Sequence, residues 1–194
     1  DHTPLDLDLV DEENRESIGR AYLTLGIDVF SRMIMGFYIS YEAPSFFNTG
    51  QCILNMIMPK DDFLKQQNVN GEWGIYGLPR EISTDNAKEF RGLDLTRFCE
   101  QYSIQIDWRP VGRSFYGANV ERVFRTLSSE VHTLSGTTFA NIIHKGNYNS
   151  QKNAAMTIGE FEQWFTELVV NVYHKKEHSE LGMTPEEKYL EGIF

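Results

Sequence analysis

The stretch RAYLTLGIDVFSRMIMGFYIS, residues 20–40, decides the fold class, because two different β-strand patterns follow each other within it. Its first half alternates apolar with polar or small residues, and the apolar positions are Leu23, Leu25, Ile27 and Val29. This alternation is typical of a strand with one buried face. Its second half, residues 33–39, is continuously apolar, as expected of a central strand. The stretch therefore predicts two consecutive strands.

The residues before this stretch predict a third strand. Leu5, Leu7 and Leu9 again occupy every second position. The polar segment DEENRESIG, residues 11–19, ends in glycine and is typical of a hairpin loop. Three strands joined by short turns predict an antiparallel meander. Asp1 precedes the first strand, and its backbone is expected to fray because it is the first residue.

The residues after the stretch alternate between helix and strand patterns. Ser45 is the predicted N-cap of a helix over residues 46–58, which Pro59 ends. Residues 60–80 contain several glycines and are predicted to form a loop. A short strand over residues 81–84 follows. Next come a helix with the apolar face Leu95, Phe98, Cys99 and Tyr102, and a strand over residues 104–108 that Pro110 stops.

The last third of the chain is predicted to be helical. One apolar stripe contains Val120, Val123, Phe124, Leu127, Val131 and Leu134, whereas residues 135–156 show little periodicity. Thr157 and Glu160 have the spacing of a capping box. The helix behind that box is predicted to bury Phe161, Trp164, Phe165, Leu168, Val169 and Val172. Thr184 begins a second capping signal, with Pro185 at the first helical position.

The resulting element order is β-β-β-α-β-α-β-α-α. It predicts an α/β fold with a mixed five-stranded sheet, three antiparallel strands and then parallel ones, flanked by helices. Residues 1–194 are expected to form one domain cut from a longer protein. Within it, residues 135–194 are expected to form a helical C-terminal extension.

Charge is distributed unevenly along the chain. The net charge is −10, which by itself argues against a nucleic-acid partner. Residues 1–16, however, hold seven acids and one base, whereas residues 104–152 hold six bases and three acids. An acidic cluster that binds metal can therefore adjoin a basic segment that binds phosphate. No stretch approaches the roughly 18 apolar residues of a membrane span, and the two cysteines lack the spacing of a zinc site.

Three acids stand out by their positions. Asp1 precedes the first strand, Asp85 directly follows a short strand, and Glu121 lies near the start of a helix. Carboxylates gathered at such element ends repel each other when empty and bind divalent metal well. Two metal ions about 3.5–4 Å apart suit phosphodiester chemistry, because they activate a nucleophile and stabilise the leaving oxygen. Spacing alone does not distinguish Asp1 from Asp6, Asp8 and Asp28.

Further motifs carry a family resemblance. Between Asp85 and Glu121 lie 35 residues, and the segments GIDVFSR (26–32), STDNAKEF (83–90) and YHKKEHSELGMTP (173–185) follow in order. Together they resemble the D,D-35-E catalytic cores of DDE transposases and retroviral-type integrases. Residues 1–13, 20–40 and 137–152 are most similar to TnsB/TniA and Mu-type bacterial transposases. One departure is Ala87, where many relatives have glycine.

The resemblance implies an RNase H-like fold, cleavage at transposon ends and transfer of 3′-OH ends into target DNA. It implies Asp1, Asp85 and Glu121 as ligands of two Mg²⁺ ions, which Mn²⁺ can replace, and Asp28 as a structural residue. It also implies transposon-end and target DNA as partners and a homo-oligomer on DNA. Some relatives work with an AAA+ ATPase regulator and a partner nuclease. A bacterial, cytoplasmic and nucleoid-associated location follows from the same resemblance.

Basic, aromatic and amide side chains near Glu121 are candidates for DNA contact. Phosphates require arginine or lysine, and bases or sugars stack on aromatics. The candidates are Arg109, Arg113, Tyr116, Asn119, Arg122, Arg125, Lys145 and Lys152. Arg125 can instead pair with Glu121 four residues earlier on a solvated helix face. His174 and His178 have zinc-compatible spacing, but no second ligand pair follows, which favours structural or phosphate contacts.

Two other functions remain open from the sequence. An RNase H-fold nuclease that only hydrolyses would have the same three acids. A DNA-binding or assembly module without catalysis would not need all three acids. A nuclease that only hydrolyses would not join precut DNA ends, whereas a transposase would. A module without catalysis would not bind Mg²⁺ or Mn²⁺, whereas either enzyme would.

Overall fold

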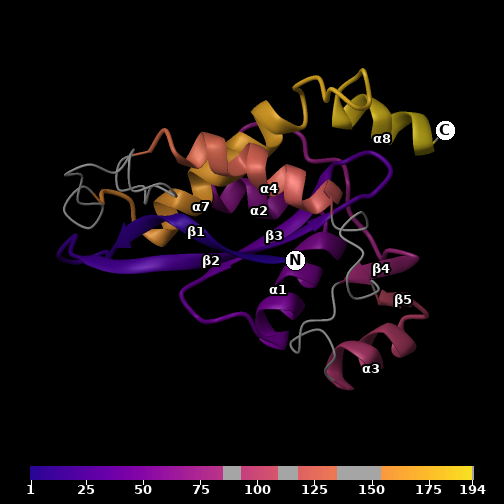
Figure 1. Ribbon diagram of the computed structural model, residues 1–194, viewed down its shortest axis with the longest axis horizontal. Coiled ribbons are helices and arrows are strands. Elements are labelled where there is room, and N and C mark those ends of the chain that lie inside the picture. The colour runs from indigo at the N-terminus through magenta and orange to yellow at the C-terminus, as the bar shows by residue number, and fades with distance from the viewer. Residues whose placement is uncertain (85–92, 109–117, 135–153, 194) are drawn as a thin grey trace.

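The computed structural model describes residues 1–84, 93–108, 118–134 and 154–193, and it shows strands enclosed by helices (Figure 1). The strands are β1 (His2–Val10), β2 (Ser17–Ile27), β3 (Ile34–Ser40), β4 (Glu81–Thr84) and β5 (Gln105–Trp108). The helices are α1 (Phe46–Ile57), α2 (Asp61–Gln66), α3 (Leu93–Gln101), α4 (Ala118–Val131), α7 (Ile158–Glu167), η2 (Leu168–Tyr173) and α8 (Pro185–Ile193). Among the described residues, no helix is long and apolar enough to cross a membrane.

The strands form two sheets in the described part of the chain. β1, β2 and β3 make the predicted antiparallel meander, and β4 pairs with β5 in parallel. The prediction of one continuous five-stranded sheet is therefore only partly confirmed. Pro4 lacks an N–H, and the β1–β2 register shifts between Pro4 and Asp8. Proline at this position suits an edge strand or a bulge rather than a strand bonded regularly on both sides.

Helices cover both faces of the meander, as Figure 1 shows. On one face, Phe37 of β3 packs against Phe165 of α7, with ring centroids 4.8 Å apart, inside a cluster that includes side chains of α4 and η2. On the other face, Tyr38 of the same strand packs against a second cluster from α1, α3 and Ile104, whereas Met35 contacts both clusters. The alternation along β3 therefore places one helical layer on each side.

Two predictions need correction, one on the end of a strand and one on a loop. The strand predicted to reach Val29 ends at Ile27, and Val29 is 59% exposed. Asp28 accepts hydrogen bonds from the Ser31 N–H and hydroxyl at 2.7 and 2.6 Å, which closes a turn and confirms its structural role. The predicted loop over residues 60–80 contains the short helix α2, whose Leu64 is buried. Burial of that side chain outweighs the weak local signal.

The helix predicted to bury Val172 also differs. After Glu167 the backbone continues as the π-helix η2, in which the His174 N–H donates to the Val169 carbonyl. The wider π turn rotates the following side chains, so Tyr173 is buried and Val172 is 44% exposed. Tyr102 of the predicted α3 face is likewise exposed, because α3 ends at Gln101.

The capping boxes at Thr157 and Thr184 are confirmed.

Candidate functional site

Asp1 is paired with the meander rather than frayed, which corrects the expectation from its terminal position. Its main-chain nitrogen donates to the Leu25 carbonyl at 2.9 Å, and the Leu25 N–H donates to the Asp1 carbonyl at 2.9 Å. Its carboxylate accepts the His2 N–H at 2.9 Å. Asp1 therefore extends the β1–β2 ladder and has a defined position.

His2 ties this end of β1 to its neighbours. Its Nδ1 lies 2.7 Å from the Thr24 hydroxyl of β2, and its Nε2 lies 3.3 Å from the Thr49 hydroxyl of α1. Both ring nitrogens thus have partners on different elements. This geometry allows His2 to orient the segment around Asp1.

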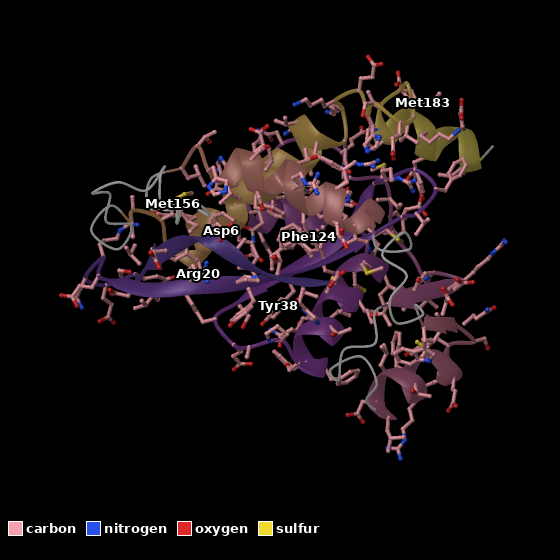
Figure 2. All side chains as sticks on the ribbon, viewed as in Figure 1. Asp6, Arg20, Tyr38, Phe124, Met156 and Met183 are labelled. Carbon is pink, nitrogen blue, oxygen red and sulfur yellow. The ribbon has the colours of Figure 1, made fainter. Side chains whose placement is uncertain are left out.

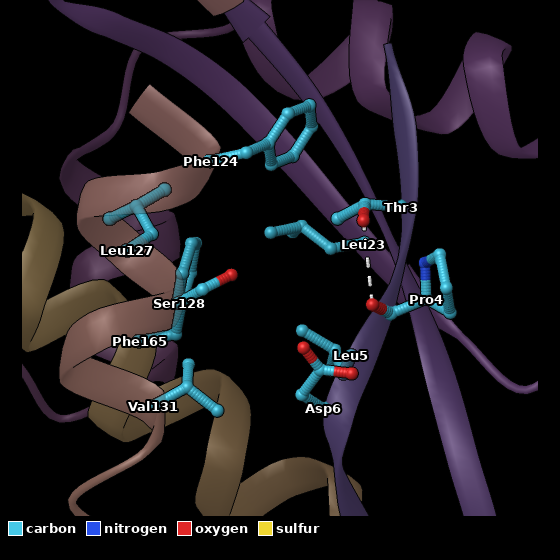
Figure 3. A pocket seen from close by; sticks show the side chains of 10 residues that line it. All are labelled: Thr3, Pro4, Leu5, Asp6, Leu23, Phe124, Leu127, Ser128, Val131 and Phe165. Atoms are coloured by element: carbon cyan, nitrogen blue, oxygen red, sulfur yellow. Dashed lines mark hydrogen bonds between the residues drawn. The ribbon is translucent and has the colours of Figure 1, made fainter. Parts of the chain in front are cut away.

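Helix α4 runs along β1 in the same direction. Figure 3 shows Phe124, Leu127 and Val131 facing Thr3, Leu5 and Asp6 across a small hollow. At the far end, His132 Nε2 lies 3.9 Å from the Asp6 carboxylate. Asp6 also pairs with Arg20 of β2 at 3.2 Å, and both residues are labelled in Figure 2. The Asp6 carboxylate is therefore already engaged in an ion pair.

This parallel course brings Asp1 and Glu121 to the same end of the layer. From His132 back to Glu121 the helix covers about 16 Å at its rise of about 1.5 Å per residue. From Asp6 back to Asp1 the strand covers about 16 Å at about 3.3 Å per residue. Glu121 is exposed in the first turn of α4 and lies one turn before Phe124, which faces β1.

The third expected ligand, Asp85, lies outside the described residues. The strand before it is described: β4 ends at the buried Thr84, which pairs with Trp108 at the end of β5. Within the described ranges, no three His, Cys, Asp or Glu side chains are grouped closely enough to hold a metal. The donor set of three carboxylates nevertheless suits Mg²⁺, which prefers oxygen ligands and takes few from protein.

The structure describes only some of the candidate DNA contacts. Arg122, in the first turns of α4, pairs with Glu180 in the segment before α8. Arg125 is exposed on the same helix. The backbone of Asn119 belongs to α4, but its side chain is outside the description. The remaining candidates also lie outside the described residues: Arg109, Arg113, Tyr116, Lys145 and Lys152.

The two histidines of the tail have different surroundings. His174 is 1% exposed, and its Nε2 accepts the Ile34 N–H at 3.1 Å. Burial lowers its pKa to about 3, so it is a neutral structural residue of the core. His178 is half-buried, and burial followed by the charges of Arg32 and Arg122 lowers its pKa.

Arg32 is a residue near this site that the sequence reasoning did not select. It occupies the left-handed region at φ 66°, in the turn between β2 and β3. Its Nε and Nη1 are buried without a hydrogen-bond partner in the described structure. The only available signal was its place in GIDVFSR, a segment noted for resemblance and not for charge.

Solved structures with a similar fold are integrase cores. The simian T-cell lymphotropic virus intasome, in complex with a PP2A regulatory subunit, matches with TM-score 0.58 and 13% identity, over 97% of this chain and 52% of that one. The HTLV-2 integrase catalytic core in complex with magnesium matches with TM-score 0.50 and 14% identity, over 96% and 90%. The chain therefore has the RNase H-like α/β fold of these cores.

The sequence comparison identifies the family within this class. The profile of the TnsB C-terminal domain matches residues 1–136, so the chain belongs to that family. It is 26% identical to the Tn552 transposase of Staphylococcus aureus over 100% of this chain and 37% of the relative. It is 30% identical to the Tn7 transposition protein TnsB of Escherichia coli over 84% of this chain and 24% of the relative. The chain thus spans well under half the length of either relative.

Proposed function

We propose that this chain is the catalytic core of a DDE transposase, which cleaves phosphodiester bonds at transposon ends and joins the 3′-OH ends to target DNA. The observation that carries the proposal is the parallel course of α4 along β1. It brings Asp1 and Glu121, two of the three expected ligands, to one end of the layer. Asp85, the third expected ligand, directly follows the C-terminal end of β4 in the sequence.

Asp1, Asp85 and Glu121 would hold two Mg²⁺ ions, with Mn²⁺ as a substitute. These ions supply activation of the attacking oxygen and stabilisation of the leaving oxygen. The chain contributes the positions of the carboxylates. Asp1 is held by Leu25 and, through its neighbour His2, by Thr24 and Thr49. Glu121 is held by the packing of α4.

The relatives support DNA as substrate and an assembly on DNA. One matched structure is an intasome, and another matched core was solved with magnesium. Both curated relatives are transposition proteins. We extend to this chain transposon-end and target DNA as partners and a homo-oligomer on that DNA. An AAA+ ATPase regulator, a partner nuclease and a nucleoid-associated location stay predictions from resemblance.

The test is strand transfer by the full-length protein carrying Asp85→Asn or Glu121→Gln. Both substitutions keep the side-chain size and remove the charge that would bind metal. We expect a loss of at least about a hundred-fold in joined product in Mg²⁺, with little change in DNA binding. Glu130→Gln, further along α4, is the matched control and should retain activity. Unchanged strand transfer by Glu121→Gln would contradict the assignment.

The same preparation separates the two alternative functions. With precut transposon ends, a transposase yields joined product, whereas a nuclease that only hydrolyses yields none. Calorimetric titration with Mg²⁺ or Mn²⁺ addresses the third possibility. Absence of binding at millimolar metal, in the presence of DNA ends, would favour a non-catalytic assembly module.

A further inference from the structure

Two arginines and a histidine from three separate elements gather beside the first turns of α4. Arg32 comes from the β2–β3 turn, Arg122 from α4, and His178 from the segment before α8. Arg122 pairs with Glu180, whose N–H donates to His178, and the charges of Arg32 and Arg122 each act on His178, so the three groups lie within electrostatic range of one another. Two arginine charges in such proximity are unfavourable unless an anion compensates them.

The turn that carries Arg32 is held rigidly. The Arg32 N–H donates to the Asp28 carbonyl at 2.9 Å, and the Tyr173 hydroxyl donates to the Arg32 carbonyl at 3.0 Å. The left-handed backbone of Arg32 is uncommon for a residue with a side chain. Two of its guanidinium nitrogens are buried without a partner in the described structure, although buried donors are normally satisfied. This geometry leaves Arg32 with donors for a ligand.

Among the described residues, Asp28 and Glu180 are acids that act on the arginines of this group. Asp28 acts on Arg32, and its carboxylate also accepts hydrogen bonds from Ser31. Glu180 pairs with Arg122 and is exposed at the tip of a tight turn that the His178–Met183 bridge closes. The carboxylate of Glu180 is therefore a partly exposed anion that already pairs with one of the two arginines.

The state of the His178 ring fits the same arrangement. Its Nδ1 accepts the Glu180 N–H at 3.3 Å, so a neutral ring carries its proton on Nε2. His178 therefore adds a hydrogen-bond donor to the two arginines without adding charge. Arg122 directly follows Glu121, so a phosphate bound here would lie next to a predicted metal ligand.

We propose that Arg32, Arg122 and His178 form a binding site for a DNA backbone phosphate, and that the Glu180 carboxylate occupies this site until DNA displaces it. The inference rests on the proposed function, because it assigns part of the DNA path to the same end of the layer. A phosphodiester carries one negative charge and can replace Glu180 without changing the local charge.

The test measures binding of duplex DNA to the full-length protein in EDTA. Fluorescence anisotropy gives the affinity over a range of salt concentrations. Glu180→Gln removes the competing charge and should tighten binding about two- to five-fold, the range of weak, partly exposed ion pairs. Glu177→Gln is the matched control, because it removes an equal charge from an exposed residue of the same tail. It should tighten binding less than two-fold, roughly the effect of net charge alone.

A second variant tests Arg32, one of the two arginines in the proposed phosphate site. Arg32→Gln should weaken binding and reduce the slope of log affinity against log salt by about 0.9, the value for one lost phosphate contact. Thermal unfolding of the variant verifies that it is folded. An unchanged slope in folded Arg32→Gln would overturn the inference, as would equal affinities of Glu180→Gln and Glu177→Gln. Neither result bears on strand transfer, which tests the proposed function separately.

Discussion

The His2 Nδ1 lies 2.7 Å from the Thr24 hydroxyl, and this contact joins the residue after Asp1 to the neighbouring strand. The other ring nitrogen faces Thr49 of α1. One imidazole therefore sets the position of the β1 start relative to both β2 and α1. If Asp1 binds metal as we propose, a side chain that orients it in this way affects metal affinity more than its own bond energies indicate.

We predict that His2→Ala lowers strand transfer roughly ten-fold or more and raises the Mg²⁺ concentration needed for half-maximal rate. The reason is the loosened position of Asp1. His132→Ala, just past the end of α4 and beside Asp6, is the matched control and should leave the metal dependence unchanged. A uniform loss of rate with an unchanged metal dependence would indicate a purely structural role for His2.

The ion pair between Arg15 and Glu160 predicts a pH dependence of stability. Hydrogen bonds from Arg15, and then from the Thr157 main chain, lower the pKa of Glu160 from 4.5 to about 2. A carboxyl group whose pKa is lower in the folded state stabilises the fold at pH values above its unfolded-state pKa. This contribution is lost as the pH falls from about 4.5 towards about 2. Glu160→Gln should therefore be less stable than the parent at pH 7 and nearly equal to it at the acid end.

Urea unfolding at a series of pH values measures this difference. Glu177→Gln, an exposed acid of the tail, is the control and should follow the parent at every pH. Thr157→Ala, which removes the other half of the capping box, should cost about 0.5–2 kcal/mol at neutral pH. A gap between Glu160→Gln and the parent that persists at pH 2 would contradict the role of the ionised carboxylate.

Two glycines of the α1 layer should respond in opposite directions to alanine. A Cβ at Gly36 of β3 would lie 2.7 Å from the Met56 main-chain nitrogen, whereas a Cβ at Gly50 within α1 would meet nothing within 4 Å. Gly36→Ala should therefore destabilise the fold by about 1–3 kcal/mol through overpacking. Gly50→Ala should stabilise it by about 0.5–1 kcal/mol, because alanine favours the helix.

The free energy of unfolding in urea checks both variants in one experiment. Each substitution adds a single methyl group, so each serves as the control for the other. Equal effects of the two would show that the close approach of α1 to β3 does not exist in solution.

Local patterns in the sequence predicted most helices and strands, because residue alternation and helix capping depend on residues only a few positions apart. Alternating leucines predicted β1 and β2, and the Thr157–Glu160 spacing predicted the start of α7. The failures have causes in tertiary structure. α2 depends on burial of Leu64, and the exposure of Val172 depends on a π turn that no residue spacing announces.

The candidate site divides in the same way. The 35-residue interval selected Asp85 and Glu121, and resemblance selected Asp1. The common end of Asp1 and Glu121 follows from the direction of α4 along β1, which depends on packing of Phe124, Leu127 and Val131. Arg32 was not selected because the role that we propose for it depends on Arg122 and His178, which are far away in the sequence.

By itself, the sequence determined the meander and most of the order of helices and strands, and it selected the acids that we propose as metal ligands. Periodicity, capping and motif spacing suffice for this because they act over a few residues or a fixed interval. Only the tertiary structure decided which charges meet. The pairing of Arg122 with Glu180 and the anchoring of Asp1 by Leu25 join residues distant along the chain. Such contacts form when the layers pack, because burial of apolar faces sets the positions of the polar groups at their edges.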